Sequence, residues 1–447
     1  MKLKLPPKVS LIIDILRRHG FEAYAVGGCV RDSVLARTPN DWDITTAARP
    51  EEIKSIFRRT VDTGIEHGTV TVLIDDASFE VTTFRVDGTY SDGRHPDSVT
   101  FTPSLKEDLK RRDFTINAMA YNDKVGLVDL YGGMEDLQKH VIRAVGDPEA
   151  RFEEDALRVM RAVRFAAQLG FAIDPVTLEA VAHHAPDLAR VSAERIQTEL
   201  VKLLISPNPG MFRILYETGI TGVIMPEFDR MMATPQNTPY HNSSVGGHTL
   251  RTLPLVPPDK VLRLAMLLHD SGKPEARCTD DNGRDHFTGH AEASVRIARG
   301  ILRRLKFDNE TIRKTLQLVK WHDLRPASDP ASVRLAVHEI GRELFFDYIM
   351  VERADTYAKS LYRQEENLTR IEEVNKTYIH VLGRGDPLSL KDLAIDGSDL
   401  LAAGFRGRQI GQILDGALKL VLKDPAYNTR ECLMTYAAGR DEKEGAS

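Results

Sequence analysis

Two aspartates on either side of a tryptophan are the first residues in this sequence whose types and spacing could do chemistry. Asp41 and Asp43 stand in "DWDIT". If this stretch is a strand, side chains two residues apart share a face, so the carboxylates converge while Trp42 turns into the packing. Converging carboxylates repel each other unless a cation lies between them, and Mg²⁺ suits such a pair together with substrate phosphates. Aspartates at this spacing also occur as loop caps, which is the purely structural alternative.

A glycine pair upstream adds an element that could bind phosphate. Gly27 and Gly28 follow the β-rich run "EAYAV" and permit a tight turn where backbone N–H groups approach phosphates closely. Arg31, just inside the following helix, could then bind a triphosphate. Glu80 in "SFEVTTFRV" lies on another predicted strand and could complete a two-metal site for in-line displacement at phosphorus.

A second group of candidate metal ligands lies far along the chain. Six of the fourteen histidines fall between residues 241 and 322. Imidazoles gathered with a carboxylate suit a divalent metal that activates water against a phosphoester. The alternative is a set of histidines satisfied by helix packing. The candidates in this segment are His248, His269, Asp270, His286, His290 and His322.

The elements that must position these residues change in kind near residue 143. Before it, β-rich runs such as "EAYAVGG", "TVTVLID" and "SVTFTP" alternate with helical stretches such as "EEIKSIF". After it almost every segment has helical period, beginning with "RFEEDALRVMRAVRFAAQLGF". The pattern predicts an α/β or α+β domain followed by a helical array.

Composition limits the class of protein. The 447 residues, 42% hydrophobic and 28% charged, indicate a soluble globular chain of about two to four domains. The net charge of −5 neither demands nor excludes a nucleic-acid partner, because phosphate contacts depend on local basic patches such as residues 109–113 and 302–306. Cys29, Cys278 and Cys432 lie far apart, which argues against disulfides and indicates the cytoplasm. We expect no cleaved signal peptide and no membrane span.

Five motifs in order extend this interpretation. They are "GGCVRD", "DWDITT", "RRDFTINAMA" (111–120), "EEDALRVMRAVRF" (153–165) and "ERIQTEL" (194–200). Together they resemble the class II tRNA nucleotidyltransferase and bacterial poly(A) polymerase family. The resemblance implies an α+β fold with a polymerase-β-like head on a mixed sheet (1–143). A helical neck (144–205), body (206–375) and tail (376–447) would follow and clamp the acceptor end and elbow of tRNA.

The resemblance also implies an activity and its residues. The enzyme would add CCA to the 3′ end of tRNA from CTP and ATP without a template, releasing pyrophosphate with Mg²⁺ as cofactor. Asp41 and Asp43 would hold Mg²⁺ as catalytic residues, with Glu80 as third acid. Arg112 and Asp113 would hold the incoming phosphate and ribose, although "RRD" is equally a helix cap with surface charge. The expected nucleotide-binding set is Gly27, Gly28, Arg31, Arg112, Asp113, Asp155, Arg158, Arg161 and Arg164.

Asp155 and Arg158 could select the base. They lie three apart and share a face if their helix is continuous. The aspartate would accept from the exocyclic amine of C or A while the arginine donates to the neighbouring ring acceptor. Uracil and guanine present the opposite pattern. An ordinary salt bridge at this spacing is the structural alternative.

Two further segments have expected roles in the same reaction. Residues 83–99, rich in Gly and Asp, resemble the flexible loop that the family needs to switch from C to A addition, with His95 where relatives have arginine. Residues 390–428, which include Arg406 and Arg408, resemble the tail that grips the tRNA elbow.

The histidine segment resembles the HD phosphohydrolase superfamily in the order H…HD…H…H…D. The HD-like region would span about 240–360, with Asp355 in "ERADTYA" as the last metal ligand and a second divalent metal as cofactor. Three alternatives to CCA addition therefore stay open. The chain could be an A-adding enzyme or poly(A) polymerase, an HD-type phosphohydrolase, or an RNA-binding protein with an inactive head; the oligomeric state is open as well.

Overall fold

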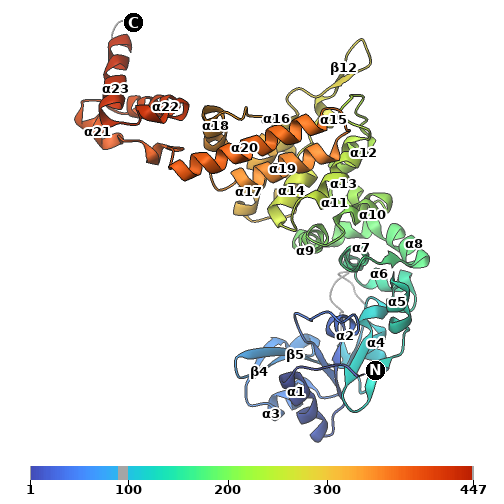
Figure 1. The fold of residues 1–447 in the computed structure, drawn as a ribbon. Coiled ribbons are helices and arrows are strands. Elements are labelled where there is room, and N and C mark those ends of the chain that lie inside the picture. The colour runs from blue at the N-terminus through green and yellow to red at the C-terminus, as the bar shows by residue number, and fades with distance from the viewer. Residues whose placement is uncertain (1, 89–98, 445–447) are drawn as a thin grey trace. The chain divides into compact units, whose positions relative to one another are not determined.

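A seven-stranded sheet in the order β3-β4-β5-β2-β1-β8-β9 forms the centre of the head in this computed structural model (Figure 1), which describes residues 2–88 and 99–444. Neighbouring strands are antiparallel except β2 and β5, which are parallel. The predicted α+β class, with a mixed sheet in the head and helices after it, is confirmed. The strands are β1 (Ala23–Val26), β2 (Ile44–Thr46), β3 (Thr60–Gly64), β4 (Thr69–Ile74), β5 (Ala77–Thr83), β8 (Met119–Asn122) and β9 (Gly126–Asp129).

Short helices cover this sheet. Tyr24 and Val26 alternate on one face of β1 and pack with Leu105 and Leu109 of α4 in a buried cluster. The helices of the head are α1 (Pro7–Arg18), α2 (Gly28–Val34), α3 (Pro50–Ile56), α4 (Leu105–Lys110) and α5 (Gly133–Lys139). The short strands β6 (Arg85–Asp87) and β7 (Val99–Phe101) pair at the two ends of the predicted loop. Residues 89–98, and with them His95, lie outside the described residues.

Helices continue the first unit after the strand β10 (Val141–Ile142), which pairs with β11 (Ala172–Ile173). The apolar residues of α7 recur with helical period and are buried, among them Met160, Val163 and Ala167. These helices are α6 (Pro148–Glu154), α7 (Leu157–Leu169), α8 (Pro175–His183), α9 (Ala193–Leu204), α10 (Phe212–Glu217) and α11 (Ile220–Ile224). The first unit ends at Pro226, so the predicted head and neck belong to one unit. The predicted boundaries at 143, 205 and 375 stay predictions.

The second unit, Glu227–Ser447, is helical over its described residues, 227–444, apart from the short hairpin β12 (Cys278–Thr279) and β13 (Asp285–His286). Aspartate side chains cap the first turns of several of its helices, as Asp259 does for α14 and Asp308 for α17. Its helices are α12 (Pro226–Ala233), α13 (Val245–Thr252), α14 (Lys260–Leu268), α15 (Lys273–Ala276), α16 (His290–Arg304), α17 (Asn309–Trp321), α18 (Pro330–Ile340), α19 (Phe345–Ala358), α20 (Gln364–Arg384), α21 (Gly397–Ala402), α22 (Arg408–Lys423) and α23 (Arg430–Glu444). Among residues 2–88 and 99–444 we find no helix with the length and apolar character that a membrane crossing requires.

Candidate active site

Asp41 and Asp43 lie immediately before β2. The strand begins at Ile44, so the prediction that "DWDIT" is a strand is wrong for its first three residues. On one side of β2, the neighbouring strand β1 ends at Val26, because Gly27 begins the turn into α2. The backbone at Asp43 still runs beside β1, because the N–H of Val26 donates to its carbonyl at 3.0 Å. Both aspartates are exposed while Trp42 between them is half-buried, as expected if the carboxylates face outward and the indole turns into the packing.

Glu80 is the neighbour of Asp43 across the sheet. Ile44 pairs with Val81 in the parallel ladder, so one step back along both strands places Asp43 beside Glu80. On β5, Val81 is buried and Glu80 is exposed, because successive side chains of a strand point to opposite faces. Asp41, Asp43 and Glu80, which we call the acidic site, therefore offer hard oxygen donors on an open face.

The electrostatics of the acidic site fit a divalent cation. Loss of hydration raises the pKa of Asp43; the positive charge of Arg112 opposes this shift and the negative charge of Asp41 adds to it. A cation between the carboxylates of Asp41 and Asp43 would relieve their repulsion. The donor set is the one that oxygen-seeking metals such as Mg²⁺ prefer.

The glycine turn and Arg112 are packed against each other. Gly27 has φ +81°, a backbone conformation that favours glycine, and a Cβ there would lie 2.9 Å from Nη1 of Arg112. Buried Asp108 holds Arg112 at 3.5 Å and Arg111 at 2.7 Å. Burial raises the pKa of Asp108, but the two arginines outweigh it and the net shift is downward. Asp108 thus anchors Arg112 beside the turn, a role that the sequence did not reveal.

Arg31, Arg161 and Arg164 surround the buried ring of Phe165. Their guanidinium carbons lie 5.1, 5.3 and 3.5 Å from its centroid, which is cation–π distance. Three guanidinium groups this close together repel one another unless hydrogen-bond acceptors, mostly carboxylates, surround them. Those acceptors are Asp32 and Asn117 for Arg31, Asp113 for Arg161, and Glu199 for Arg164. We call these three arginines and the ring the Phe165 cluster.

Asp113 connects the head to α7 through this cluster. Its Oδ1 accepts from the N–H of Phe114 at 2.8 Å and from Nδ2 of Asn117 at 3.2 Å. Its Oδ2 accepts from Nε of Arg161 at 2.8 Å. Burial raises the pKa of Asp113, but the charge and hydrogen bonds of Arg161 outweigh it and hold the pKa far below its usual value. The ribose contact expected for Asp113 stays a prediction, since the observed partners are protein groups.

Asp155 and Arg158 do not lie within one helix as the spacing suggested. Helix α6 ends at Glu154 and α7 begins at Leu157, because the carboxylate of Asp155 turns back to accept from the N–H of Leu157 at 3.1 Å. Asp155 also accepts from Nη2 of Arg195 at 2.8 Å, whereas Arg158 pairs with Glu154 at 2.6 Å. The alternative of a salt bridge between Asp155 and Arg158 therefore does not hold.

Two members of this network stood inside the recognised motifs without an assigned role. Asn117 follows Asp113 by four residues in "RRDFTINA", and Glu199 lies in "ERIQTEL". The signal that could have revealed Phe165 is its place directly after Arg164. Arg161 lies four residues before Phe165 and shares its helix face, a spacing at which a guanidinium can reach a ring.

The second unit brings together the predicted metal ligands of the histidine segment. Asp270 belongs to two groups whose ligand atoms lie within 4.8 Å of one another, one with His248 and His269 and one with His290 and His322. Oδ1 of Asp355 lies 2.9 Å from Nε2 of His248. We call His248, His269, Asp270, His290, His322 and Asp355 the histidine centre. His286 instead pairs with Asp280 on the exposed hairpin.

Hydrogen bonds to the backbone orient three of the imidazoles of the histidine centre through their Nδ1 atoms. Nδ1 of His269, His290 and His322 donates to a backbone carbonyl three residues earlier, at 2.7, 2.8 and 2.7 Å. A carbonyl only accepts, so each Nδ1 carries a hydrogen, and in the neutral form of each ring Nε2 presents a lone pair. Nε2 of His290 and Nε2 of His322 are 3.2 Å apart, so either a hydrogen on one of the two nitrogens or a bound cation must lie between them.

Positive side chains line the cavity around the histidine centre. Burial raises the pKa of Asp270, but His269 and Lys273 outweigh it and hold that pKa well below its usual value. Lys359 does the same for buried Asp355. The cavity measures about 460 Å³ and includes three arginines in its lining, Arg284, Arg325 and Arg370. Six carboxylates line the same cavity, those of Asp270, Asp285, Glu292, Asp323, Glu352 and Asp355, so its lining carries charges of both signs. Sequence reasoning missed both lysines because their contacts depend on helix packing.

Family models match most of the chain. Residues 23–143 match the poly A polymerase head domain, and residues 170–232 match a probable RNA and SrmB-binding site of polymerase A. Residues 287–437 match a putative tRNA nucleotidyltransferase domain 2.

Similar proteins agree over the full length. A CCA-adding enzyme of Enterococcus faecalis is 38% identical over 451 residues, which cover 99% of both chains. The solved CCA-adding enzyme of Bacillus stearothermophilus in complex with CTP is 30% identical, covers 99% of this chain and 100% of its own, and superposes with a TM-score of 0.76. The Thermotoga maritima CCA-adding enzyme complexed with tRNA shares the fold, with a TM-score of 0.61, 21% identity and coverage of 98% and 100%. The chain belongs to the family of CCA-adding enzymes, which are nucleotidyltransferases with a poly(A) polymerase head.

Proposed function

We propose that this protein adds C, C and A to the 3′ end of tRNA, using CTP and ATP without a template and releasing pyrophosphate. The observation that carries the proposal is the acidic site beside the Gly27 turn and Arg112, in a chain that aligns end to end with a CCA-adding enzyme. A similar solved enzyme was described with CTP, and the three free cysteines are consistent with activity in the cytoplasm.

The acidic site supplies the metal ligands of this proposal. A nucleotidyltransferase family implies dependence on a divalent metal, and we infer Mg²⁺ held by Asp41 and Asp43 with Glu80 as third acid. Bound there, Mg²⁺ stabilises the charge that develops as the tRNA 3′-OH displaces pyrophosphate. The turn at Gly27 and Gly28 lets the nucleotide phosphates approach the backbone.

The arginines near the acidic site have two different roles in nucleotide binding. Arg112, anchored by Asp108 beside the turn, receives the phosphates. The three guanidinium nitrogens of Arg31 donate to Asp32 and Asn117, so we assign Arg31 to positioning. Arg161 and Arg164 keep the same role within the Phe165 cluster.

Asp155 and Arg158 read the base from the junction of α6 and α7. The proposal does not need a shared helix face, because Nη2 of Arg158 donates to the carbonyl of Arg111 and Asp155 is fixed at the junction by the N–H of Leu157. Nη1 of Arg158 also donates to the carbonyl of Arg151, and the side-chain partners of the pair, Glu154 and Arg195, are the ones that a base edge can replace. An acceptor and a donor so placed match cytosine and adenine and reject uracil and guanine.

The test is extension of a tRNA that lacks its last three nucleotides, with Mg²⁺ and with CTP, ATP or both. We expect two added residues with CTP alone and three with both, resolved at single-nucleotide length. A single A added only to a tRNA ending in CC would indicate an A-adding enzyme, and a long A ladder a poly(A) polymerase. Asp41→Ala and Asp43→Ala should abolish extension.

The histidine centre favours a second candidate function, metal-dependent hydrolysis of a phosphoester. The supporting observation is the pair of imidazole Nε2 atoms 3.2 Å apart, beside buried Asp270 and in a cavity that also holds lysine and arginine side chains. Histidine nitrogens and aspartate oxygens suit transition metals such as Mn²⁺, Co²⁺ or Ni²⁺. Such a metal supplies an activated water, and Lys273 and the cavity arginines hold the phosphate.

The two candidate activities have separate tests. RNA ending in a 2′,3′-cyclic phosphate or a 3′-phosphate, incubated with Mn²⁺, Co²⁺ or Ni²⁺, should be hydrolysed by the wild type and by Asp41→Ala. Asp270→Asn should lose hydrolysis and retain CCA addition. Absence of hydrolysis with all three metals would leave the histidine centre without this activity and would not affect the proposal for the acidic site.

A further inference from the structure

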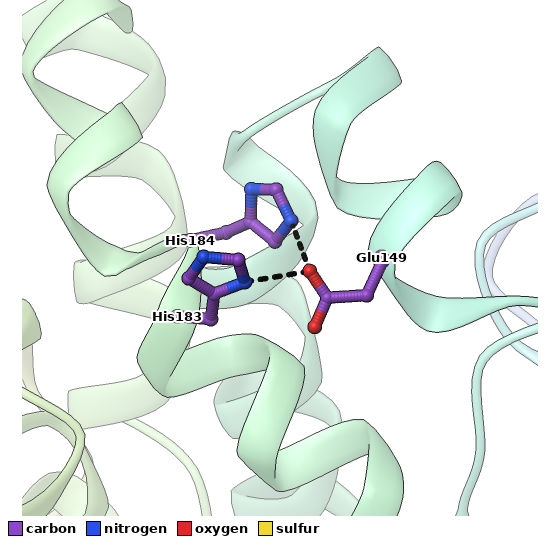
Figure 2. A group of neighbouring side chains, drawn as sticks. All are labelled: Glu149, His183 and His184. Atoms are coloured by element: carbon purple, nitrogen blue, oxygen red, sulfur yellow. Dashed lines mark hydrogen bonds and ion pairs between the residues drawn. The ribbon is translucent and has the colours of Figure 1, made fainter.

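A third group of metal-ligating side chains lies in the neck, outside the acidic site and the histidine centre. Glu149 is on α6, His183 is the last residue of α8, and His184 follows it directly (Figure 2). Oε2 of Glu149 lies 2.7 Å from Nδ1 of His183 and 2.9 Å from Nε2 of His184. One nitrogen of each imidazole therefore faces the same carboxylate oxygen. We call Glu149, His183 and His184 the neck triad.

A second carboxylate orients His184 for ligation. Nδ1 of His184 lies 2.7 Å from Oδ2 of Asp187, and Oδ1 of Asp187 lies 2.8 Å from Nη2 of Arg190. Because a carboxylate accepts, Nδ1 carries a hydrogen toward Asp187, and a metal would take the place of the hydrogen that Nε2 shares with Glu149. A ligating histidine whose other nitrogen donates to a carboxylate is the usual arrangement in protein metal sites. The edge-on ring of buried Phe152, 6.3 Å away, further restricts the imidazole.

The spacing of the neck triad is close to what a tetrahedral metal requires. Bonds of about 2.0–2.2 Å to nitrogen and oxygen place neighbouring ligand atoms about 3.3 Å apart. The observed 2.7 and 2.9 Å must therefore open by roughly half an ångström. His183 and Glu149 can move this far because their side chains are 72% and 47% exposed. The side chain of His184 is only 12% exposed and is held in place by its surroundings.

We propose that the neck triad binds a divalent metal of the zinc type, with Glu149, His183 Nδ1 and His184 Nε2 as ligands and solvent in the fourth position. The metal cross-links α6 to the end of α8. Since α6 ends immediately before Asp155, the cross-link restrains the segment that leads to the proposed base-reading pair. The site does not depend on either proposed activity.

Metal stoichiometry of the full chain tests this site directly. The probe is Co²⁺ alone, measured by equilibrium dialysis with elemental analysis and by visible absorption. We expect Glu149→Gln and His183→Gln to bind one equivalent less than the wild type and to lose an intense tetrahedral ligand-field band. The control is His19→Gln, a surface histidine bonded to the carbonyl of Ile15, which should match the wild type. Comparing variants cancels metal bound at the acidic site and the histidine centre.

A second variant tests the role given to Asp187. Asp187→Asn keeps the three ligands and removes the carboxylate behind His184, so Co²⁺ should bind the triad about 10- to 100-fold more weakly with unchanged stoichiometry at saturation. Equal stoichiometry and equal spectra for the wild type and His183→Gln would overturn the site. Unaltered Co²⁺ affinity in Asp187→Asn would overturn the orienting role. Circular dichroism without metal verifies that each variant is folded.

Discussion

Replacing Asp113 by alanine should destabilise the first unit by about 3 kcal/mol. Removal of one partner from a buried ion pair costs about 3–5 kcal/mol, because the remaining charge stays unpaired. The lower end applies here, since the side chain of Arg161 is 32% exposed and keeps a carboxylate oxygen of Glu199 at 3.8 Å. The same change also removes the acceptor of two hydrogen bonds, from the N–H of Phe114 and from the side-chain amide of Asn117. The loss of unfolding free energy should therefore be no smaller than about 3 kcal/mol.

The chain offers a natural reporter for this measurement. Each unit contains one of the two tryptophans: Trp42 lies in the first unit, and Trp321 lies on α17 in the second. In a Trp321→Phe background, fluorescence in urea follows the first unit, and about 3 kcal/mol should lower the midpoint by about 1–1.5 M at a slope of 2–3 kcal/mol/M. Asp62→Ala is the matched control, because its pair with Lys54 is on the surface and worth about 0–1 kcal/mol. Equal midpoint shifts for the two variants would refute the linking role of Asp113.

The pH dependence of the same variant has a defined sign. The pKa of Asp113 in the folded state lies below that of the unfolded chain, which is about 3.9. The stabilisation is therefore fully present above about pH 4 and is lost as the pH falls. The difference in urea midpoint between wild type and Asp113→Ala should be constant from pH 7 to 5 and should shrink on going to pH 3. A difference that grows in acid would contradict the charge pairing.

Two further predictions follow from single contacts and a third from the loop segment. Gly27→Ala should raise the KM for CTP and ATP at least tenfold in the extension assay, because its Cβ would displace Arg112; Gly28→Ala, whose Cβ has no neighbour closer than 3.6 Å, should change KM much less. Arg334→Met should speed amide hydrogen exchange in α22, because Arg334 donates to its last carbonyls at 2.8 Å; equal exchange would exclude that anchor. Deletion of residues 86–94 should stop the product at CC, and full CCA would refute that role for the loop.

The sequence predicted the parts of the site that are local in the chain. Gly27, Asp41 and Asp43 belong to short motifs whose chemistry follows from residue type and spacing, and the structure places them around one turn and one strand start. The position of Glu80 depends on which strands pair. The sequence named Glu80, but only the parallel ladder of β2 and β5 places it beside Asp43.

The break between α6 and α7 shows why the rest was not predictable. The apolar residues around Asp155 recur with a helical period, which predicts one continuous helix. This pattern carries no information on whether the Asp155 carboxylate will accept from a backbone N–H and interrupt the helix. The outcome also depends on Arg195, forty residues later, which holds the other oxygen of the carboxylate. Lys273 and Lys359 stayed unassigned for the same reason, since their partners lie within buried contacts between elements.

The proposed base selection without a template requires that the proposed base-reading pair keep a fixed distance from the acidic site. In the first unit, that connection is made by charges: Arg31 and Asp113 of the head meet Arg161 and Arg164 of α7 around the ring of Phe165. Buried ionic contacts demand defined partners and angles, whereas apolar packing tolerates substitution and small shifts. Conservative changes in the cluster, such as Arg161→Lys, should therefore affect the choice between C, A and U more than they affect global stability. Misincorporation of UTP by Arg161→Lys, measured beside its urea midpoint, separates these two consequences.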